Sequence, residues 1–392
     1  MKQKQFLLFL LASGLLGITQ SVDNSVINNF LNDVYHLTVF QRTQLELPRE
    51  FPGFAVVFVS GLLFFFGDVR IAAIATGLGA LGMVGLAFLS PGYGGMVLWL
   101  LVYSMGQHLF MPVSNSIVMG LADTGKMGAK LGQVNALNTA VFLVSNLALA
   151  FAFRYFKLDY RWTFGISALA FFAAAVLLLF MTPHKGKRSG KRFVFRKEYS
   201  LYYWLNILFG ARKQIFITFG PWVLIKVFGQ GVSTFAVLGF VIAGCNIFFK
   251  PFVGHLIDKV GERFVLAGEA VLLIFVCLGY AFSKSLLEQV GLASLALIFV
   301  SVCFVLDQIL SAVGMARATY LRKIAITPED VSPTLSMGTT LDHLVSMFVP
   351  WIAGYVWNRF GYEYVFVAGA CIALVNFFLT NQIKVLNKEP VS

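Results

Sequence analysis

The feature that most constrains this chain is a succession of long apolar segments separated by short polar stretches. About 20 residues of helix cross the ~30 Å hydrocarbon core of a bilayer, and each segment approaches or exceeds that length. Only 12% of the residues are charged, about half of the ~25% typical of soluble domains, which excludes a soluble fold. A segment surrounded by lipid must satisfy its own backbone hydrogen bonds, which favours helices. The sequence therefore predicts an all-α membrane protein with twelve transmembrane helices, near residues 6–30, 43–66, 70–89, 96–118, 131–152, 162–181, 200–226, 232–253, 263–282, 290–315, 333–356 and 363–383.

The net charge of +12 could suggest nucleic-acid binding, but the basic residues flank the apolar segments. Basic residues beside membrane spans mark the cytoplasmic side. We therefore predict a multi-pass protein of a cell membrane, of the bacterial inner-membrane type, with both termini in the cytoplasm. Anionic lipid headgroups are then a better partner than nucleic acid. The densest basic run lies between the sixth and seventh segments and comprises Lys185, Lys187, Arg188, Lys191, Arg192, Arg196 and Lys197.

The two halves of the chain resemble each other. In the first half Gly132 opens a segment that leads to Arg154-Tyr155-Phe156, and in the second half Gly338 opens one that leads to Arg359-Phe360. Such a repeat is typical of transporters built from duplicated helical bundles. We predict a six-helix bundle at 1–181, a basic cytoplasmic linker at 182–199 and a second six-helix bundle at 200–392, and we expect the chain to act as a monomer.

A charged stretch of ten residues, Gly254 to Arg263, separates the eighth and ninth apolar segments. Lipid cannot accommodate such a cluster, so we expect a tight loop at the membrane surface. Its pattern, G-x-L-x-D-x-x-G-x-R, closely resembles the loop signature of the major facilitator superfamily of solute transporters. The resemblance implies two six-helix repeats, a solute site near the midplane and transport by alternating access. It also implies that Gly254, Asp258, Gly261 and Arg263 take part in the conformational change.

The corresponding stretch of the first half, Gly61 to Arg70, departs from this pattern. Its acid, Asp68, comes three positions late, and its second glycine is out of register. In the family this loop helps hold the two halves in one state. Whether the first loop does so here is therefore left open.

Polar residues occur inside the first, fourth and fifth apolar segments. Polar groups within a bilayer usually face a cavity or a partner, because lipid offers them no hydrogen bonds. His108 titrates near physiological pH in its unperturbed state, although a lone membrane histidine is often a hydrogen-bonded packing residue. We expect these segments to contribute substrate contacts through Gln20, Asn24, His108, Asn115 and Asn138.

Two adjacent cations, Arg212 and Lys213, lie about 18 Å into the seventh segment, close to the membrane midplane. Adjacent residues of a helix point about 100° apart, so the two cations should have different neighbours. As a functional interpretation, both are substrate-binding candidates for an anionic solute, since guanidinium matches carboxylate and phosphate. The structural alternative is an ion pair with Asp307, Asp342 or Asp23.

Acids inside the segments are candidates for proton coupling, since burial favours the neutral form of a carboxyl group. Asp307 and the pair Asp342-His343 give the second half what we take to be its only deep acids. In the second segment Glu46 and Glu50 lie on one helical face with Arg49, either as a proton-carrying cluster or as a salt-bridged gate. Arg317 looks like a cytoplasmic anchor.

No catalytic motif, metal-ligand spacing or nucleotide-binding element is present, and the four cysteines are scattered singly. We therefore predict no enzyme activity, no metal and no cofactor. The expected function is secondary active transport of a small polar solute, favouring an organic anion and proton coupling. One alternative is a multidrug or lipophilic-compound efflux pump, although 134–151 contains neither Gly nor Pro where such pumps carry a G-P motif. An alternative of another class is a non-transporting membrane sensor or scaffold.

Overall fold

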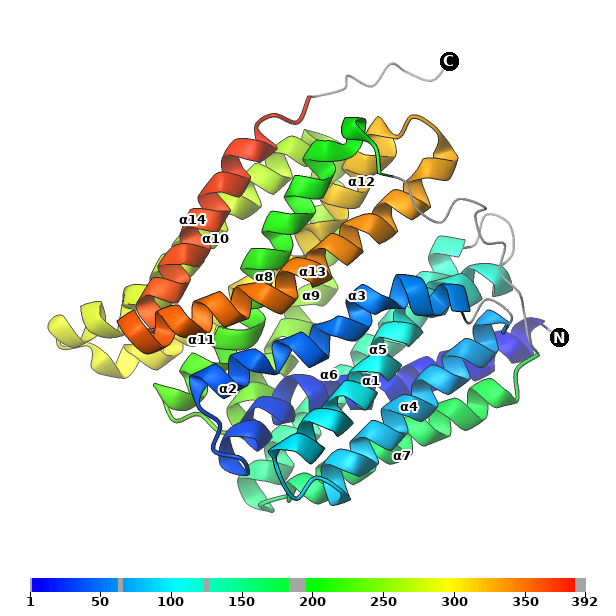
Figure 1. The fold of residues 1–392 in the computed structure, drawn as a ribbon, viewed down its shortest axis with the longest axis horizontal. Coiled ribbons are helices and arrows are strands. Elements are labelled where there is room, and N and C mark those ends of the chain that lie inside the picture. The colour runs from blue at the N-terminus through cyan, green and yellow to red at the C-terminus, as the bar shows by residue number, and fades with distance from the viewer. Residues whose placement is uncertain (1, 63–65, 123–126, 183–194, 385–392) are drawn as a thin grey trace. The chain divides into compact units, whose positions relative to one another are not determined.

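The computed structural model of the protein describes residues 2–62, 66–122, 127–182 and 195–384. The chain divides into two compact units, which are described separately (Figure 1). Unit 1 comprises Met1–Thr38, Leu47–Arg188 and Gln230–Ala243, and unit 2 comprises Val39–Glu46, Ser189–Gly229 and Gly244–Ser392. The boundaries of the two predicted bundles remain a prediction. Residues 39–46, which were predicted for the first bundle, group with unit 2. Residues 230–243, which were predicted for the second bundle, group with unit 1.

Six long helices carry the predicted spans of the first half. They are α1 (Lys2–Asp33), α3 (Glu46–Leu62), α4 (Asp68–Phe88), α5 (Tyr93–Leu121), α6 (Met127–Tyr155) and α7 (Tyr160–Leu179), with the short α2 (Val39–Gln44) between the first two. Within unit 1, α4 packs against α5 and α7, and α1 packs against α6 and α7. Glycines allow the closest of these crossings, since a Cβ on Gly106 would lie 2.5 Å from the Ala75 carbonyl oxygen of α4. Small residues of this kind let transmembrane helices approach through their backbones.

The predicted spans of the second half also coincide with helices. These are α8 (Ser200–Lys226), preceded by the 3-10 turn η2 (Lys197–Tyr199), then α9 (Val232–Val260), α10 (Glu262–Gln289), α11 (Ala293–Leu310), α12 (Gly314–Ile324), α13 (Pro328–Phe360) and α14 (Tyr362–Thr380). The tenth predicted span ended too early: after α11 the 3-10 turn η3 (Ser311–Val313) leads directly into α12. The charges of α12, which ended the apolar pattern, are compatible with a continued helix because Arg317 is buried against protein.

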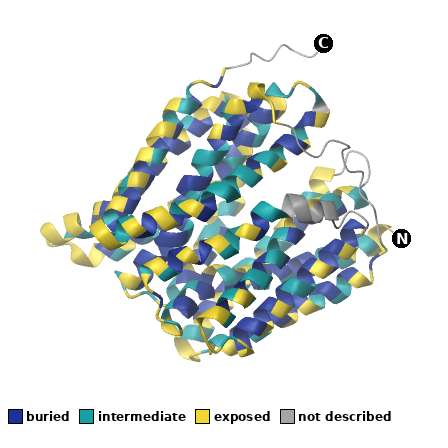
Figure 2. Cartoon of the chain, in the orientation of Figure 1, coloured by how far each residue is buried: buried dark blue, intermediate teal, exposed yellow. Residues whose placement is uncertain are grey.

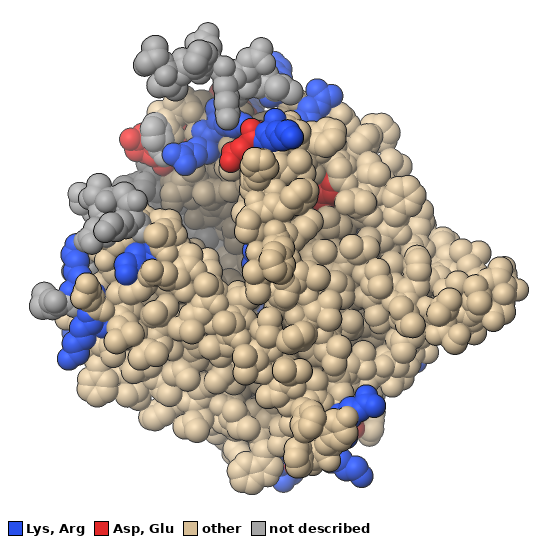
Figure 3. All heavy atoms as spheres, turned by 180° about the vertical axis from the view of Figure 1, so that it is seen from behind, with Lys and Arg blue, Asp and Glu red and all other residues tan. Residues whose placement is uncertain are grey.

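The fold class is as predicted, an all-helical membrane protein. In the described chain, nine helical spans are long and apolar enough to cross a bilayer. Of the other three long helices, α3 has only 17 described residues, and α8 and α13 carry charged site candidates, which lower their hydropathy. On the face in Figure 3, most charged side chains lie toward the margins and uncharged side chains cover most of the rest, as expected of a lipid-facing surface.

Buried and exposed residues alternate along the helices (Figure 2), and large apolar side chains are found among both. In unit 2 Phe216, Tyr280 and Phe366 pack as a buried aromatic group. On the outside, Phe248 and Phe275 are more than two-thirds exposed. Exposed apolar patches of this kind would be unfavourable in water but are compatible with lipid.

Candidate functional site

A pocket of about 280 Å³ in unit 1 contains many of the predicted polar residues. It lies among α1, α5 and α6, with Phe171 of α7 at its wall. The predicted substrate residues Gln20, Asn115 and Asn138 all line it. Its other polar lining residues are Ser13, Thr19, Gln107, Ser114 and Asn135. The helical spacing of the polar residues places them on one face of each helix, and the polar faces of α1, α5 and α6 line the same cavity.

The amides of the pocket differ in how far they are already engaged. Gln107 Nε2 donates to Tyr103 Oη at 2.5 Å, and Asn138 Nδ2 donates to the Ser13 carbonyl at 2.9 Å. Within the described residues, the exposed side chains of Gln20, Asn115 and Asn135 make no hydrogen bond to protein. Each such amide offers donors and an acceptor to a solute.

Two predicted substrate residues of unit 1 lie outside this pocket. Asn24 is exposed on α1 but does not line the cavity. His108 Nδ1 lies 3.1 Å from Ser104 Oγ and 2.9 Å from the Ser104 carbonyl oxygen. These local contacts fit the packing role that was the alternative for this histidine.

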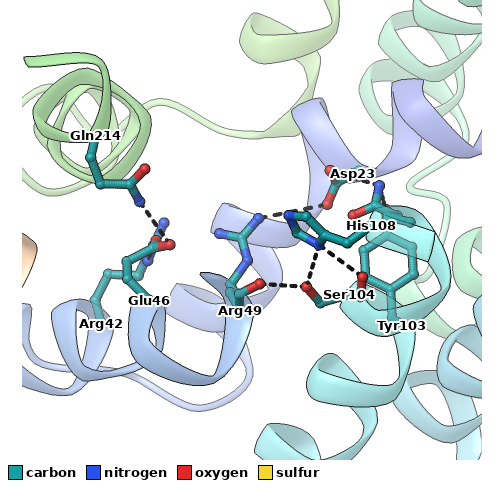
Figure 4. Close-up of polar contacts among 9 residues, drawn as sticks. Asp23, Arg42, Glu46, Arg49, Tyr103, Ser104, His108 and Gln214 are labelled. Atoms are coloured by element: carbon teal, nitrogen blue, oxygen red, sulfur yellow. Dashed lines mark hydrogen bonds and ion pairs between the residues drawn. The ribbon is translucent and has the colours of Figure 1, made fainter. Parts of the chain in front are cut away.

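Asp23 of unit 1 is held by groups from two other helices (Figure 4). Its carboxylate lies 3.9 Å from Arg49 and accepts a hydrogen bond from Gln107 at 3.4 Å. Ser104 Oγ donates to the Arg49 carbonyl oxygen at 2.5 Å. The start of α3 is thereby joined to α1 and α5 through polar side chains.

Glu46 has different partners from the ones that its spacing suggested. It belongs to unit 2, where it forms a fully buried ion pair with Arg42 and accepts a hydrogen bond from Gln214 Nε2 at 2.9 Å (Figure 4). Glu50 is half-buried on α3. Arg42 was not among the residues predicted from the sequence, because it precedes the apolar stretch and only the fold buries it.

The two midplane cations of α8 each have an acidic partner on another helix of unit 2. Arg212 forms a buried ion pair with Asp307 of α11. Lys213 Nζ lies 2.8 Å from both carboxylate oxygens of Asp342 on α13. The expected divergence of the two side chains is observed, and two of the three candidate acids are their partners. His343, which follows Asp342, is half-buried.

A third pair in unit 2 corrects two sequence interpretations. Glu269 of α10 is buried, so Asp307 and Asp342 are not the only deep acids of the second half. Its partner is Arg317 of α12, 3.5 Å away and itself 4% exposed, which is not a surface anchor. The signal that could have found the pair was Glu269 itself, an acid within the otherwise apolar stretch 264–282.

The charged loop between α9 and α10 is a one-residue turn at Gly261. Its φ of 85° lies in the left-handed region that favours glycine. Gly254 and Asp258 belong to the last turns of α9, and Arg263 Nη2 donates to Asn381 Oδ1 at 3.2 Å. In the first loop, residues 63–65 lie outside the described chain, and Asp68 accepts a hydrogen bond from Ser116 Oγ at 2.5 Å.

Comparison with known proteins agrees with this architecture. The family model described as "Major Facilitator Superfamily" matches residues 51–321. No curated protein sequence matches the chain. Three similar solved structures are the nucleoside transporter NupG (13% identity, TM-score 0.74, 97% of this chain and 98% of that one), a bacterial homologue of the human lysosomal transporter Spinster (15%, 0.72, 97% and 97%) and a D-xylose-proton symporter (15%, 0.70, 97% and 97%). The chain thus belongs to the Major Facilitator Superfamily and is a multi-pass membrane transporter rather than an enzyme.

Proposed function

We propose that this protein is a secondary active transporter that moves a small polar solute by alternating access, and that the amide-lined pocket of unit 1 binds the solute. The observation that carries the proposal is the set of three exposed amides, Gln20, Asn115 and Asn135, on one cavity of about 280 Å³. Binding sites of this kind combine apolar walls with a few polar groups that orient the ligand. Here Phe110, Met111 and Phe171 supply the apolar walls.

The lining favours an uncharged polar solute over the organic anion that the sequence suggested. Among the described residues, no Asp, Glu, Lys or Arg lines the unit 1 pocket. In unit 2 the charges of Arg212 and Lys213 are balanced by Asp307 and Asp342. Two similar structures are named for a nucleoside and for D-xylose, which are rich in hydrogen-bonding groups. An organic anion remains the alternative, with Lys213, which is partly exposed, as its contact.

We also propose that transport is coupled to protons. Protonation of Asp307 or Asp342 removes the negative partner of Arg212 or Lys213, and so weakens an ion pair that joins α8 to α11 or α13. Glu46, paired with Arg42, Glu50 and His343 are further candidates. One similar structure is named as a proton symporter.

We also propose that the chain works as a monomer in a bacterial inner membrane, with both termini in the cytoplasm. Its basic linker would then contact anionic lipid headgroups. Residues 183–194 of this linker lie outside the described residues.

The test is solute uptake by the purified chain in proteoliposomes. Candidate solutes are a nucleoside, a pentose, a dicarboxylate and a lipophilic cation. We expect the Asn115→Ala variant to take up the polar solute with a KM about 2- to 10-fold higher, since one hydrogen bond contributes ~0.5–1.5 kcal/mol. The Gln289→Ala variant removes an exposed amide outside the pocket and should be unaffected.

Each other outcome identifies a different function. Uptake of the dicarboxylate alone would establish the anion alternative, and uptake of the lipophilic cation alone would indicate efflux of lipophilic compounds. No uptake of any compound would favour a sensor or scaffold. An inward acid gradient should drive accumulation by the wild type but not by Asp307→Asn. Equal accumulation by both would rule out Asp307 as the coupling group.

A further inference from the structure

A second polar pocket lies entirely within unit 2 and goes beyond the proposed solute site. Its volume is about 240 Å³, and it lies among α8, α12 and α13. This volume is below the ~300–1,000 Å³ of pockets that hold drug-sized ligands. Its polar lining residues are Tyr202, Asn206, Arg317, Thr339 and Asp342. A ligand of this site is therefore small and makes several polar contacts.

Arg317 is the cationic end of this pocket. Its guanidinium stacks on Phe209, with Cζ 3.7 Å from the ring centroid. A Cβ on Gly314, another lining residue, would lie 3.1 Å from Arg317 Nη2, which places that nitrogen against the pocket wall. The stacked, buried position fixes the plane of the guanidinium, and a fixed guanidinium favours bidentate binding of a carboxylate.

The hydrogen-bonding capacity of Arg317 is unused. Guanidinium carries five N–H donors, yet within the described chain Arg317 makes no hydrogen bond, and its one ion pair, with Glu269, spans 3.5 Å. Neither carboxylate oxygen of Glu269 accepts a hydrogen bond from the described residues. Donors that make no hydrogen bond within the protein can be offered to an acceptor in the pocket.

Asp342 is the anionic end of the same pocket. Its carboxylate contacts Lys213 at 2.8 Å, and its side chain is 14% exposed. Arg317 forms an ion pair with Glu269, and Lys213 forms one with Asp342. The four charges around the pocket therefore sum to zero. A singly charged ligand would leave the pocket with a net charge, whereas a ligand that carries both charges would not.

From this arrangement we propose that the pocket binds a small zwitterion, with its carboxylate on Arg317 and its ammonium group on Asp342. Asn206 and Thr339 then contact the polar substituents of the ligand. Asn206 Nδ2 already donates to the Tyr202 carbonyl at 2.7 Å, which leaves its side-chain oxygen to accept. An α-amino acid with a short polar side chain has the required size and charges.

The experiment is calorimetric titration of the purified full-length chain with glycine, L-alanine, L-serine and L-threonine. Two analogues of L-threonine each lack one charge: 3-hydroxybutanoate lacks the ammonium group and 1-amino-2-propanol lacks the carboxylate. We expect at least one zwitterion to bind, and both analogues to bind about 10- to 100-fold more weakly than L-threonine. If no amino acid binds, or if an analogue binds as well as its parent, the proposal is wrong.

Two variants locate the binding. The double variant Arg317→Gln/Glu269→Gln removes the guanidinium without leaving a buried charge, and should weaken zwitterion binding about 10- to 100-fold. Asp342→Asn leaves Lys213 unbalanced, so 3-hydroxybutanoate should bind this variant more tightly than the wild type. Arg359→Gln removes an exposed arginine at the end of α13 and is the matched control. Wild-type affinity in both pocket variants would overturn the proposal, and because binding is measured without transport, the result is independent of the solute assigned to unit 1.

Discussion

At the scale of single residues, the buried pair of Arg212 and Asp307 makes a sharp prediction. Each side chain is only 4% exposed. Removing one member of a buried ion pair costs ~3–5 kcal/mol, because the other charge is left without compensation. Arg212→Gln should therefore lower the thermal unfolding temperature of the purified protein strongly, and Arg212→Gln/Asp307→Asn should recover most of the loss.

The neighbouring pair provides the comparison. Lys213 is 22% exposed and its partner Asp342 is 14% exposed, so both charges keep part of their solvation. Lys213→Gln should reduce stability by less than Arg212→Gln. If instead Arg212→Gln unfolds at the wild-type temperature and only loses transport, Arg212 binds solute and its pairing with Asp307 contributes little to the fold.

At the scale of helices, the contact of α4 with α5 depends on Gly106. A Cβ at this position would lie 2.5 Å from the Ala75 carbonyl oxygen and 2.6 Å from the Gly79 nitrogen. Gly106→Ala should therefore reduce the free energy of unfolding by ~1–3 kcal/mol, because the helices must separate. Gly77→Ala on α4 is the control, since a Cβ there meets no atom within 4 Å. Equal unfolding temperatures for the two variants would contradict this role for Gly106.

Tyr199, which directly precedes α8, forms hydrogen bonds with the segment around the start of α13. Its hydroxyl donates to Asp330 Oδ2 at 3.0 Å and accepts from the Ile326 amide at 2.9 Å. Burial is the main cause that raises the pKa of Tyr199 above its usual value of about 10. Because this pKa is raised, the neutral hydroxyl contributes fully to stability below the pKa that Tyr199 has in the unfolded protein. This contribution is lost only as the pH rises through the pKa of the folded protein.

Tyr199→Phe should therefore lower the unfolding temperature by the same amount at every pH from about 6 to 9. The free energy of unfolding should fall by about 1–3 kcal/mol, since Asp330 and Ile326 lose a buried hydrogen-bond partner. The measurement is thermal unfolding of both proteins across this pH range. A difference that shrinks within it would mean that the hydroxyl already ionises there.

The helices could be read from the sequence because lipid imposes length and apolarity on each of them. The turn at Gly261 was likewise predictable, since four charges crowd around one glycine. The ion-pair partners of the charged residues were predictable only in part, because pairing depends on how each helix is rotated about its axis. Asp307 and Asp342 were candidates for Arg212 and Lys213, whereas Glu269 and Arg317 were missed, since the apolar pattern gave no reason to bring α10 and α12 together.

At the scale of the whole molecule, the distribution of basic residues predicts its orientation in the membrane. Most of the 30 Lys and Arg residues fall in loops that alternate to one side of the predicted spans, beginning with Lys2 and Lys4 and including the basic linker. Basic loops are retained in the cytoplasm. With this threading, Gly92, between α4 and α5, lies outside, and Ile326, between α12 and α13, lies inside.

Cysteine labelling of intact cells tests this orientation. Gly92 and Ile326 suit single substitutions, because a Cβ at Gly92 meets no atom within 4 Å and the Ile326 side chain is 53% exposed. In a chain whose four native cysteines are replaced by serine, Gly92→Cys should react with a membrane-impermeant maleimide in intact cells. Ile326→Cys should react only after the membrane is permeabilised. The reverse pattern would place both termini outside and would mean that the basic loops do not determine the topology.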